Sequence, residues 1–154
     1  PALPLLIAGL KDPDTSVRRD CAGAIGRFGS AAHAAAAVLV PLFAEPDTRT
    51  RIVAATALKR MGRIAIPALL DGLHAHDPEV RGRCASVLGY IAPDEPTVTE
   101  ALRRALYDHE EDVRQRANEA LELMSAPTAD SFPGPWPVPN RMASSSAVER
   151  LLAP

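Results

Sequence analysis

An arginine that recurs at nearly constant spacing constrains most strongly what this chain can fold into. It stands at Arg18, Arg51, Arg81 and Arg114, so that consecutive copies are 33, 30 and 33 residues apart. A period of this size is typical of solenoid proteins, in which each repeat is one supersecondary unit that stacks on its neighbours. The spacing therefore divides residues 1–125 into four units.

The residues around each arginine also recur, in columns that we number from the arginine. Position −4 holds an acid in every unit, namely Asp14, Asp47, Asp77 and Glu110. Position −8 is large and apolar, and positions +7 and +10 are apolar as well, the +7 column being Ile25, Leu58, Leu88 and Leu121. Position +3 is small throughout. This agreement predicts that all four units adopt one structure.

Each unit has the pattern of two helices. In the first unit, apolar residues at three- and four-residue spacing occupy one face of each helix, first Leu3, Leu6, Ile7 and Leu10, then Val17, Cys21, Ala24, Ile25 and Phe28. The acid at −4 fits the N-cap of the second helix. Gly29 and Gly62 are predicted to end second helices in the left-handed conformation, and Pro41 is predicted to kink or shorten a first helix.

The predicted fold is therefore all-α. We expect a right-handed α-solenoid of about four antiparallel helix pairs over residues 1–125, because no single pair can bury its apolar faces alone. A Pro/Ser-rich extended segment is predicted over 126–146, since Pro133, Pro135, Pro137 and Pro139 alternate around Trp136. A short helical turn is predicted over 147–154. Phe132, Trp136, Leu151 and Leu152 are the predicted anchors of this tail.

Composition excludes several classes of function. The chain has 17 basic and 19 acidic residues, so no overall charge favours a nucleic acid or an anionic membrane. No apolar run reaches the roughly 18 residues that span a bilayer. Two cysteines without metal-binding spacing predict a reducing, cytoplasmic location. The excess of Arg, Ala and Pro is associated with bacterial proteins.

The motif Leu10-x-Asp12-Pro13-Asp14-x-x-Val17-Arg18, followed by Ala22-x-Ala24-Ile25-Gly26, resembles the short HEAT-like repeat named after the phycobilisome lyases. The stretch from 73 to 89 carries the same motif, and the stretch from 106 to 121 carries it with substitutions. The resemblance implies a solenoid, and this repeat occurs in scaffolds, lyase subunits, hydroxylases and DNA-binding proteins. It also implies a hydrogen-bonded ladder between units, formed by Asp14, Arg18, Asp47, Arg51, Asp77, Arg81, Glu110 and Arg114.

The sequence lacks the metal ligands of one enzyme class with this repeat. Iron-dependent hydroxylases that are built on this repeat place His-Glu pairs directly after the repeated Val-Arg. Here those positions hold Arg19-Asp20, Ile52-Val53, Gly82-Arg83 and Gln115-Arg116. We therefore expect no metal, no cofactor and no catalytic residue. Cys21 and Cys84 share a core column two units apart and are predicted to be buried thiols that do not pair.

Positions +1, +2, +5, +8 and +9 of the second helices are predicted to face a concave groove. The candidate binding residues in these columns are Arg19, Arg27, Ile52, Lys59, Arg60, Arg83, Tyr90, Arg116 and Leu123. Six cations against the three acids Asp20, Glu119 and Glu122 make the groove mildly basic. It is therefore predicted to take an acidic protein or peptide surface, with an ordinary solvated helix face as the open alternative.

The function predicted from the sequence is a non-catalytic adaptor or scaffold that binds a protein or peptide. Two alternatives stay open, namely an accessory or lyase subunit resembling the bilin lyases, and a nucleic-acid binder resembling the HEAT-like DNA glycosylases. Terminal repeats usually carry a polar outer face, yet residues 1–10 are almost wholly apolar. This end is therefore predicted to be covered by upstream repeats or by a partner.

Overall fold

The computed structural model describes residues 2–125, and the predictions for the tail lie outside these residues. The helices, with 3₁₀ segments labelled η, are α1 (Ala2–Gly9), α2 (Thr15–Phe28), η1 (Gly29–Ala35), α3 (Ala36–Leu39), η2 (Val40–Ala44), α4 (Thr48–Met61), η3 (Gly62–Ala65), α5 (Ile66–Gly72), α6 (Pro78–Ile91), α7 (Pro96–Ala105) and α8 (Glu111–Ser125). The described part of the chain contains no strand.

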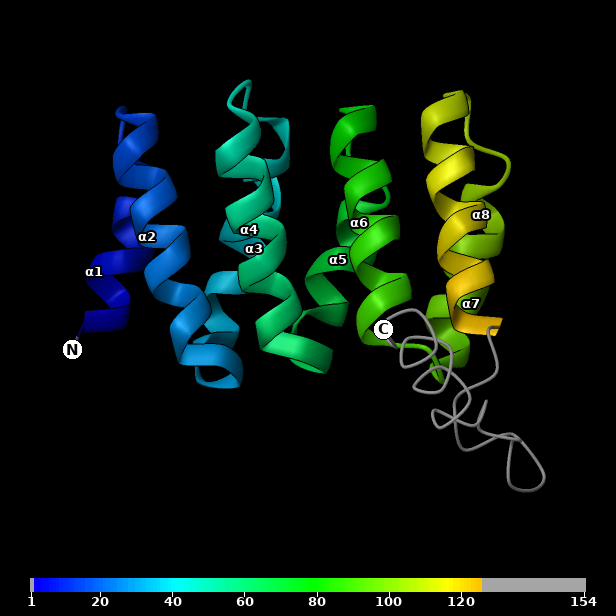
Figure 1. Ribbon diagram of the computed structural model, residues 1–154, viewed down its shortest axis with the longest axis horizontal. Coiled ribbons are helices and arrows are strands. Elements are labelled where there is room, and N and C mark those ends of the chain that lie inside the picture. The colour runs from blue at the N-terminus through cyan, green and yellow to red at the C-terminus, as the bar shows by residue number, and fades with distance from the viewer. Residues whose placement is uncertain (1, 126–154) are drawn as a thin grey trace, which may run out of the picture.

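The helices form two layers, which confirms the predicted all-α solenoid (Figure 1). The long helices α2, α4, α6 and α8 stand side by side in one layer. The shorter α1, α3, α5 and α7 lie behind them and form a second layer, which we call the outer layer. We call the exposed surface of the first layer the long-helix face. The core lies between the layers, where Ile25, Leu58 and Leu88 have no exposed surface and Leu121 is partly buried against it.

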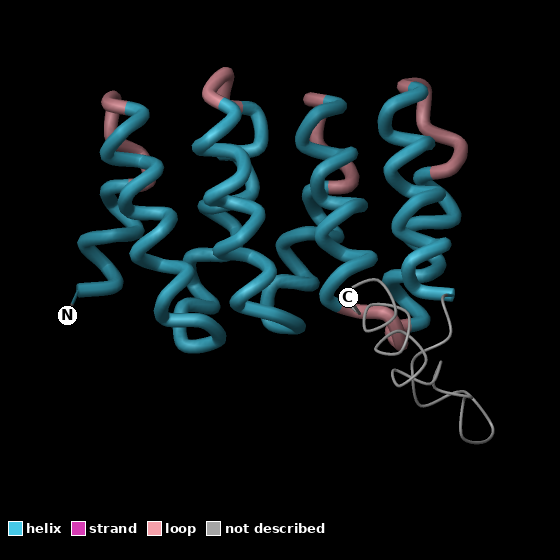
Figure 2. The backbone as a smooth tube through the Cα atoms, in the orientation of Figure 1, coloured by secondary structure: helices cyan, strands magenta, loops and turns pink. Residues whose placement is uncertain are grey.

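The loops that enter the long helices gather at one edge of the molecule (Figure 2). In each loop the repeated arginine closes its own unit, because its Nη1 donates to the backbone carbonyls six and five residues earlier. Arg18 Nη1, for example, lies 2.7 Å from Asp12 O and 2.9 Å from Pro13 O. Arg51, Arg81 and Arg114 make the same pair of bonds. The recurring arginine is therefore first a loop-closing residue.

The predicted N-cap acids are found at three of the four long helices, and Glu110 makes no such bond among the described residues. The carboxylates of Asp14, Asp47 and Asp77 cap α2, α4 and α6 by accepting backbone N–H groups. Gly29 and Gly62 end α2 and α4 at φ 55° and 65°, a region that favours glycine, although their ψ values of −133° and −141° differ from the predicted left-handed helical conformation.

The outer layer of the second unit is broken, as Pro41 predicts. It consists of η1, the four-residue α3 and η2, which contains the proline. One 18-residue window within Thr15–Ala44 is apolar enough for a membrane span, in contrast to the sequence prediction. The chain reverses at Gly29 inside that range, so these residues form no single straight helix.

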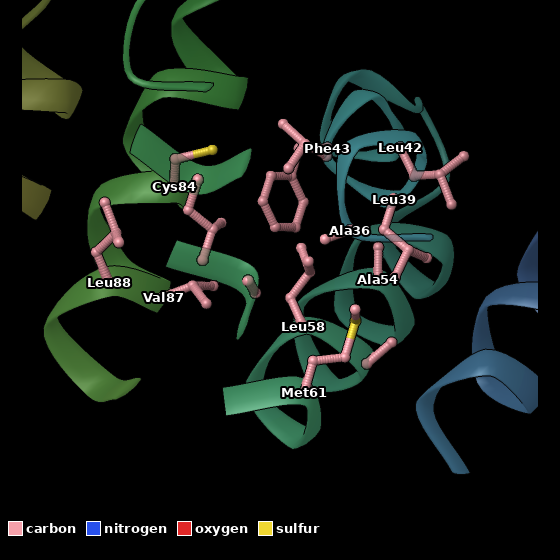
Figure 3. Close-up of a cluster of buried hydrophobic side chains, with 14 of the residues drawn as sticks. Ala36, Leu39, Leu42, Phe43, Ala54, Leu58, Met61, Cys84, Val87 and Leu88 are labelled. Carbon is pink, nitrogen blue, oxygen red and sulfur yellow. The ribbon is translucent and has the colours of Figure 1, made fainter. Parts of the chain in front are cut away.

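The long helices are unevenly spaced. Gly26 of α2 meets Ala57 of α4, and Gly89 of α6 meets Ala120 of α8, so closely that a Cβ on either glycine would lie 3.1 Å or less from the facing alanine. Contacts between α4 and α6 are sparse by comparison, and η2 packs against α6 instead. Figure 3 shows the fully buried Phe43 of η2 filling this joint beside Leu58 and opposite Cys84.

Candidate functional site

The most exposed column of the long-helix face is position +9. It consists of Arg27, Arg60, Tyr90 and Leu123, and Tyr90 and Leu123 are 61% and 54% exposed. Ile52, another predicted anchor, is 55% exposed. At these predicted positions, α4, α6 and α8 thus each present one large apolar side chain to solvent.

Three of the six predicted cations are held by acids. Arg19 Nη1 lies 3.4 Å from Asp47 Oδ2 of the next unit. Arg83 Nε lies 2.6 Å from Glu79 Oε1 one helical turn earlier. Arg116 Nε lies 2.8 Å from Asp112 Oδ2, and its Nη2 lies 3.4 Å from Glu79. Arg19 and Arg116 thus link neighbouring units, Arg83 pairs within its own helix, and the charge of all three is largely compensated.

The other three cations have no carboxylate partner among residues 2–125. Arg27, Lys59 and Arg60 lie in the last turns of α2 and α4, where a positive charge also complements the helix dipole. Arg27 and Arg60 line a pocket of about 250 Å³ between the two helices. Its other lining residues are small or β-branched, namely Gly23, Gly26, Val53, Thr56 and Ala57. The uncompensated charge is thus concentrated at one end of the long-helix face.

Lys59 also contacts the neighbouring helix. Its Nζ lies 4.5 Å from the centroid of the Tyr90 ring, a cation–π distance. Lys59 occupies column +8, where α2 and α6 carry Gly26 and Gly89. A long side chain at this position is consistent with the wide spacing of α4 and α6, and it joins the basic end to the exposed tyrosine.

The prediction that columns +1 and +8 face the groove is wrong for three glycines. Gly26, Gly82 and Gly89 are buried, because these columns point toward the following unit wherever two long helices pack closely. A Cβ on Gly82, for instance, would lie 2.8 Å from Cδ of Arg116. The exposed part of the face is therefore narrower than the sequence indicated.

The inter-unit ladder exists, but its acids stand at position −6 instead of the predicted −4. Arg18 donates to Glu45 from Nε and Nη2 at 2.9 and 2.7 Å. Arg81 donates to Asp108 in the same way, at 2.8 Å for both bonds. These bonds raise the pKa of both arginines and lower the pKa of Asp108.

Three of the four −4 acids bond within their own unit. The carboxylates of Asp14, Asp47 and Asp77 cap their own helices, which turns them away from the preceding arginine. Hydrogen bonds from Thr50 lower the pKa of Asp47, and only this member of the column reaches the preceding unit, through Arg19. Glu110 is exposed and makes no ion pair within residues 2–125.

The ladder is missing between the second and third units. Position −6 of the third unit is Ala75, so Arg51 finds no carboxylate there. Its Nε is buried without a hydrogen bond among the described residues, and the nearest carboxylate oxygen, Glu79 Oε1, is 3.6 Å away. Sequence reasoning overlooked this column, although three of its four residues are acidic, namely Asp12, Glu45 and Asp108.

Sequence reasoning also overlooked Glu79, the acid that connects the most units. It lies within 4 Å of Arg51, Arg83 and Arg116, one from each of the last three units. The acid at −2 recurs only at Asp112, so the column carries a weak signal. Glu79, Glu45 and Asp108 therefore join neighbouring units through arginines. Arg27 and Arg60 are not among the partners of these acids.

Among the chemically reactive groups, Cys84 has a structural role. Residues 2–125 contain no cluster of three or more His, Cys, Asp or Glu that could hold a metal ion. Cys21 and Cys84 are free thiols. Burial raises the pKa of Cys84 to about 12, so this thiol is not a nucleophile at neutral pH. Its Sγ packs where a Cβ on Gly72 would stand, which allows α5 to approach α6.

Comparison with solved structures supports the fold through one match with a TM-score of 0.50. Engineered proteins whose crystal structures were determined by the Northeast Structural Genomics Consortium are 24% identical to the chain. One has a TM-score of 0.50 and is matched over 82% of this chain and 64% of its own length; another has a TM-score of 0.48 over 79% and 62%. The chain thus spans less than two thirds of these structures. No curated protein matches it.

The family is shown by a match to sequence models. The model described as HEAT repeats matches residues 1–59 and 66–132, which is most of the chain. The repeated two-helix units, their arginine-closed loops and their stacking along one axis agree with that match. The chain belongs to the HEAT-repeat family.

Proposed function

We propose that the chain is a protein- or peptide-binding module whose long-helix face takes an extended, acidic segment of a partner. One observation carries the proposal, namely that Arg27, Lys59 and Arg60 stay without a carboxylate partner in residues 2–125 while the other cations of the face are paired. HEAT repeats commonly mediate such contacts. An acidic side chain would find these cations around the pocket between α2 and α4.

Apolar groups next to the cations would give such a contact its affinity. Surface ion pairs contribute little by themselves, on the order of 1 kcal/mol or less. Exposed aromatic and aliphatic side chains bury more apolar area, and Arg and Tyr are enriched among binding hot spots. Tyr90 of α6 contacts Lys59, and Ile52 is exposed about two turns before Lys59 on α4. We therefore expect a partner segment with an acid beside an aromatic or aliphatic residue.

The same charges disfavour nucleic acid. Duplex binding gains affinity from many neutralised phosphates, and each contact adds to its salt dependence. Three uncompensated cations, on a face whose predicted groove positions also include Asp20, Glu119 and Glu122, offer few such contacts. The lyase-subunit alternative stays a prediction, which a bound chromophore in protein purified from its source would support.

A peptide library tests the proposal. Random peptides displayed on phage are selected on the immobilised chain, and the affinity of the enriched peptides is measured by fluorescence anisotropy. We expect enriched peptides to be acidic and to contain an aromatic or aliphatic residue. The double variant Arg27→Glu, Arg60→Glu should bind them at least about ten-fold more weakly, since reversed charges repel the acid.

The matched control makes the same charge change on the outer layer. Arg103→Glu with Arg104→Glu alters two exposed residues of α7, away from the long-helix face. This control should keep its peptide affinity within about two-fold, as expected for surface charges outside the peptide-binding face. Enriched peptides without an acidic bias, or an equal loss in the control, would contradict the proposal.

A further inference from the structure

The first unit exposes apolar positions that the later units bury fully or in part. Val17, at position −1, is 37% exposed, whereas its counterparts Thr50, Val80 and Val113 are 0%, 5% and 0% exposed. Phe28, at +10, is 42% exposed, whereas Met61 is 2% exposed and Ile91 and Met124 are partly buried. Only the first unit lacks a preceding unit among the described residues. Within residues 2–125, the N-terminal end therefore exposes positions that face a neighbouring unit elsewhere in the solenoid.

Asp12 at this end has the arrangement of a ladder acid. Asp108 accepts hydrogen bonds from Arg81, and its Oδ1 also accepts the backbone N–H of Glu110, 3.0 Å away. Asp12 accepts the equivalent N–H of Asp14 at Oδ1, 2.8 Å away. Both carboxylates are thus fixed by the same turn, but no arginine of a preceding unit reaches Asp12 within residues 2–125.

The opposite end carries the complementary donor. Arg114 closes its own loop through Nη1, as Arg18 and Arg81 do, which leaves Nε and Nη2 for a following unit. These two donors meet no acceptor among residues 2–125. An open, mainly apolar hollow of about 400 Å³ lies at the same end, lined by Pro93, Leu106, Leu121 and Met124 among others.

We propose that the C-terminal end of one copy stacks on the N-terminal end of a second copy and continues the solenoid. In this contact Arg114 donates Nε and Nη2 to Asp12 of the second copy, while Val17 and Phe28 cover the hollow. A second copy fits this end because the chain's own fourth unit presents the ladder donor for which Asp12 is arranged. Head-to-tail contacts leave both outer ends open, so association continues beyond a dimer as concentration rises.

Sedimentation velocity of the full chain over a wide concentration range tests this proposal. We expect the mean sedimentation coefficient to rise with concentration. Asp12→Asn keeps the acceptor for the Asp14 N–H but removes the charge, and it should weaken self-association at least about ten-fold. Asp20→Asn, an exposed acid on the long-helix face, should leave self-association unchanged. A chain that stays monomeric at every concentration overturns the proposal, and so does equal weakening by the control.

A mixing experiment tests the head-to-tail direction. Val17→Glu places a charge on the N-terminal end and leaves the C-terminal end intact, and it does not disturb the core because Val17 is already partly exposed. The variant alone should stay monomeric. A trace of labelled variant should nevertheless co-sediment with the wild-type chain, because its C-terminal end can still bind. Exclusion of the variant would indicate contact between two N-terminal ends and would overturn the proposal.

Discussion

At the scale of single residues, the repeated arginine closes its own loop and, in Arg18 and Arg81, also bonds to an acid of the next unit, whereas Arg51 does only the first. All four arginines close their own loops, but Arg51 has no acid to complete the ladder because the third unit carries Ala75 at position −6. Its buried Nε is left without a hydrogen bond in the described structure. A buried donor without a partner costs free energy, so this position is a local weakness.

Replacing Ala75 by aspartate should remove this weakness. We expect Ala75→Asp to raise the free energy of unfolding by about 1 kcal/mol at neutral pH, since a charge-assisted bond to a partly buried arginine exceeds a typical surface pair. The arginine would lower the pKa of the new carboxyl, as Arg81 lowers that of Asp108. The gain should therefore be present above the ordinary carboxyl pKa and be lost as pH falls through the lowered one.

Urea denaturation at neutral and acidic pH measures the gain. Ala75→Asn provides the control, because it has the same shape without the charge and should gain clearly less. Equal stabilisation by both variants would mean that the ion pair does not form.

The sequence predicts the loop residues better than the ladder. The −4 acids and the arginines recur in all four units, and their N-cap and loop-closing positions depend only on residues within one unit. The ladder acids depend on which loop atoms face the preceding unit. Because an N-cap acid is already bonded to its own helix, the acid two residues earlier becomes the inter-unit partner, as in Glu45.

At the scale of elements, small residues set the spacing of the long helices. Gly89 of α6 faces Ala120 of α8, and a Cβ on Gly89 would lie 2.8 Å from the Cα of that alanine. Backbone atoms cannot move aside without shifting the helix. The size of the residue in column +8 therefore determines whether two long helices pack closely. The apolar pattern of one helix does not show how closely the next helix approaches it. For this reason the prediction from the sequence wrongly assigned Gly26 and Gly89 to the groove surface.

Replacing Gly89 by alanine should push α6 and α8 apart. We expect Gly89→Ala to lower the free energy of unfolding by about 1–3 kcal/mol, the usual cost of overpacking, despite the better helix propensity of alanine. Gly23→Ala is the matched control, because its Cβ would meet only Val53 Cγ1 at an ordinary 3.6 Å. The control should stabilise by up to about 1 kcal/mol. Thermal denaturation compares the two, and opposite signs are the expected outcome.

At the scale of the whole molecule, three features weaken the same joint. Between the second and third units the ladder lacks its acid, Lys59 replaces the glycine of column +8, and Pro41 breaks the outer layer. The first two units and the last two units each pack closely through Gly26 and Gly89. The solenoid therefore consists of two tight halves, and Lys59 and Tyr90 of the proposed binding face meet across the joint between them.

Phe43 is the residue on which the union of these halves most depends. It is fully buried, comes from η2 of the first half, and lies beside α6 of the second half (Figure 3). Phe43→Ala should cost about 3–5 kcal/mol, as expected when a large core side chain leaves a cavity. Repeat proteins unfold as one unit only while the interfaces between units are strong. Loss of this contact should therefore let the two halves unfold separately.

Hydrogen exchange in increasing denaturant distinguishes separation of the halves from uniform destabilisation. In the wild-type chain, the amides of α2 and α4 should share one unfolding midpoint with those of α6 and α8. In Phe43→Ala the two groups should acquire different midpoints. Leu102→Ala removes a fully buried residue of α7, inside the second half, and should lower both midpoints together. A common midpoint in Phe43→Ala would show that the joint is held by contacts other than this ring.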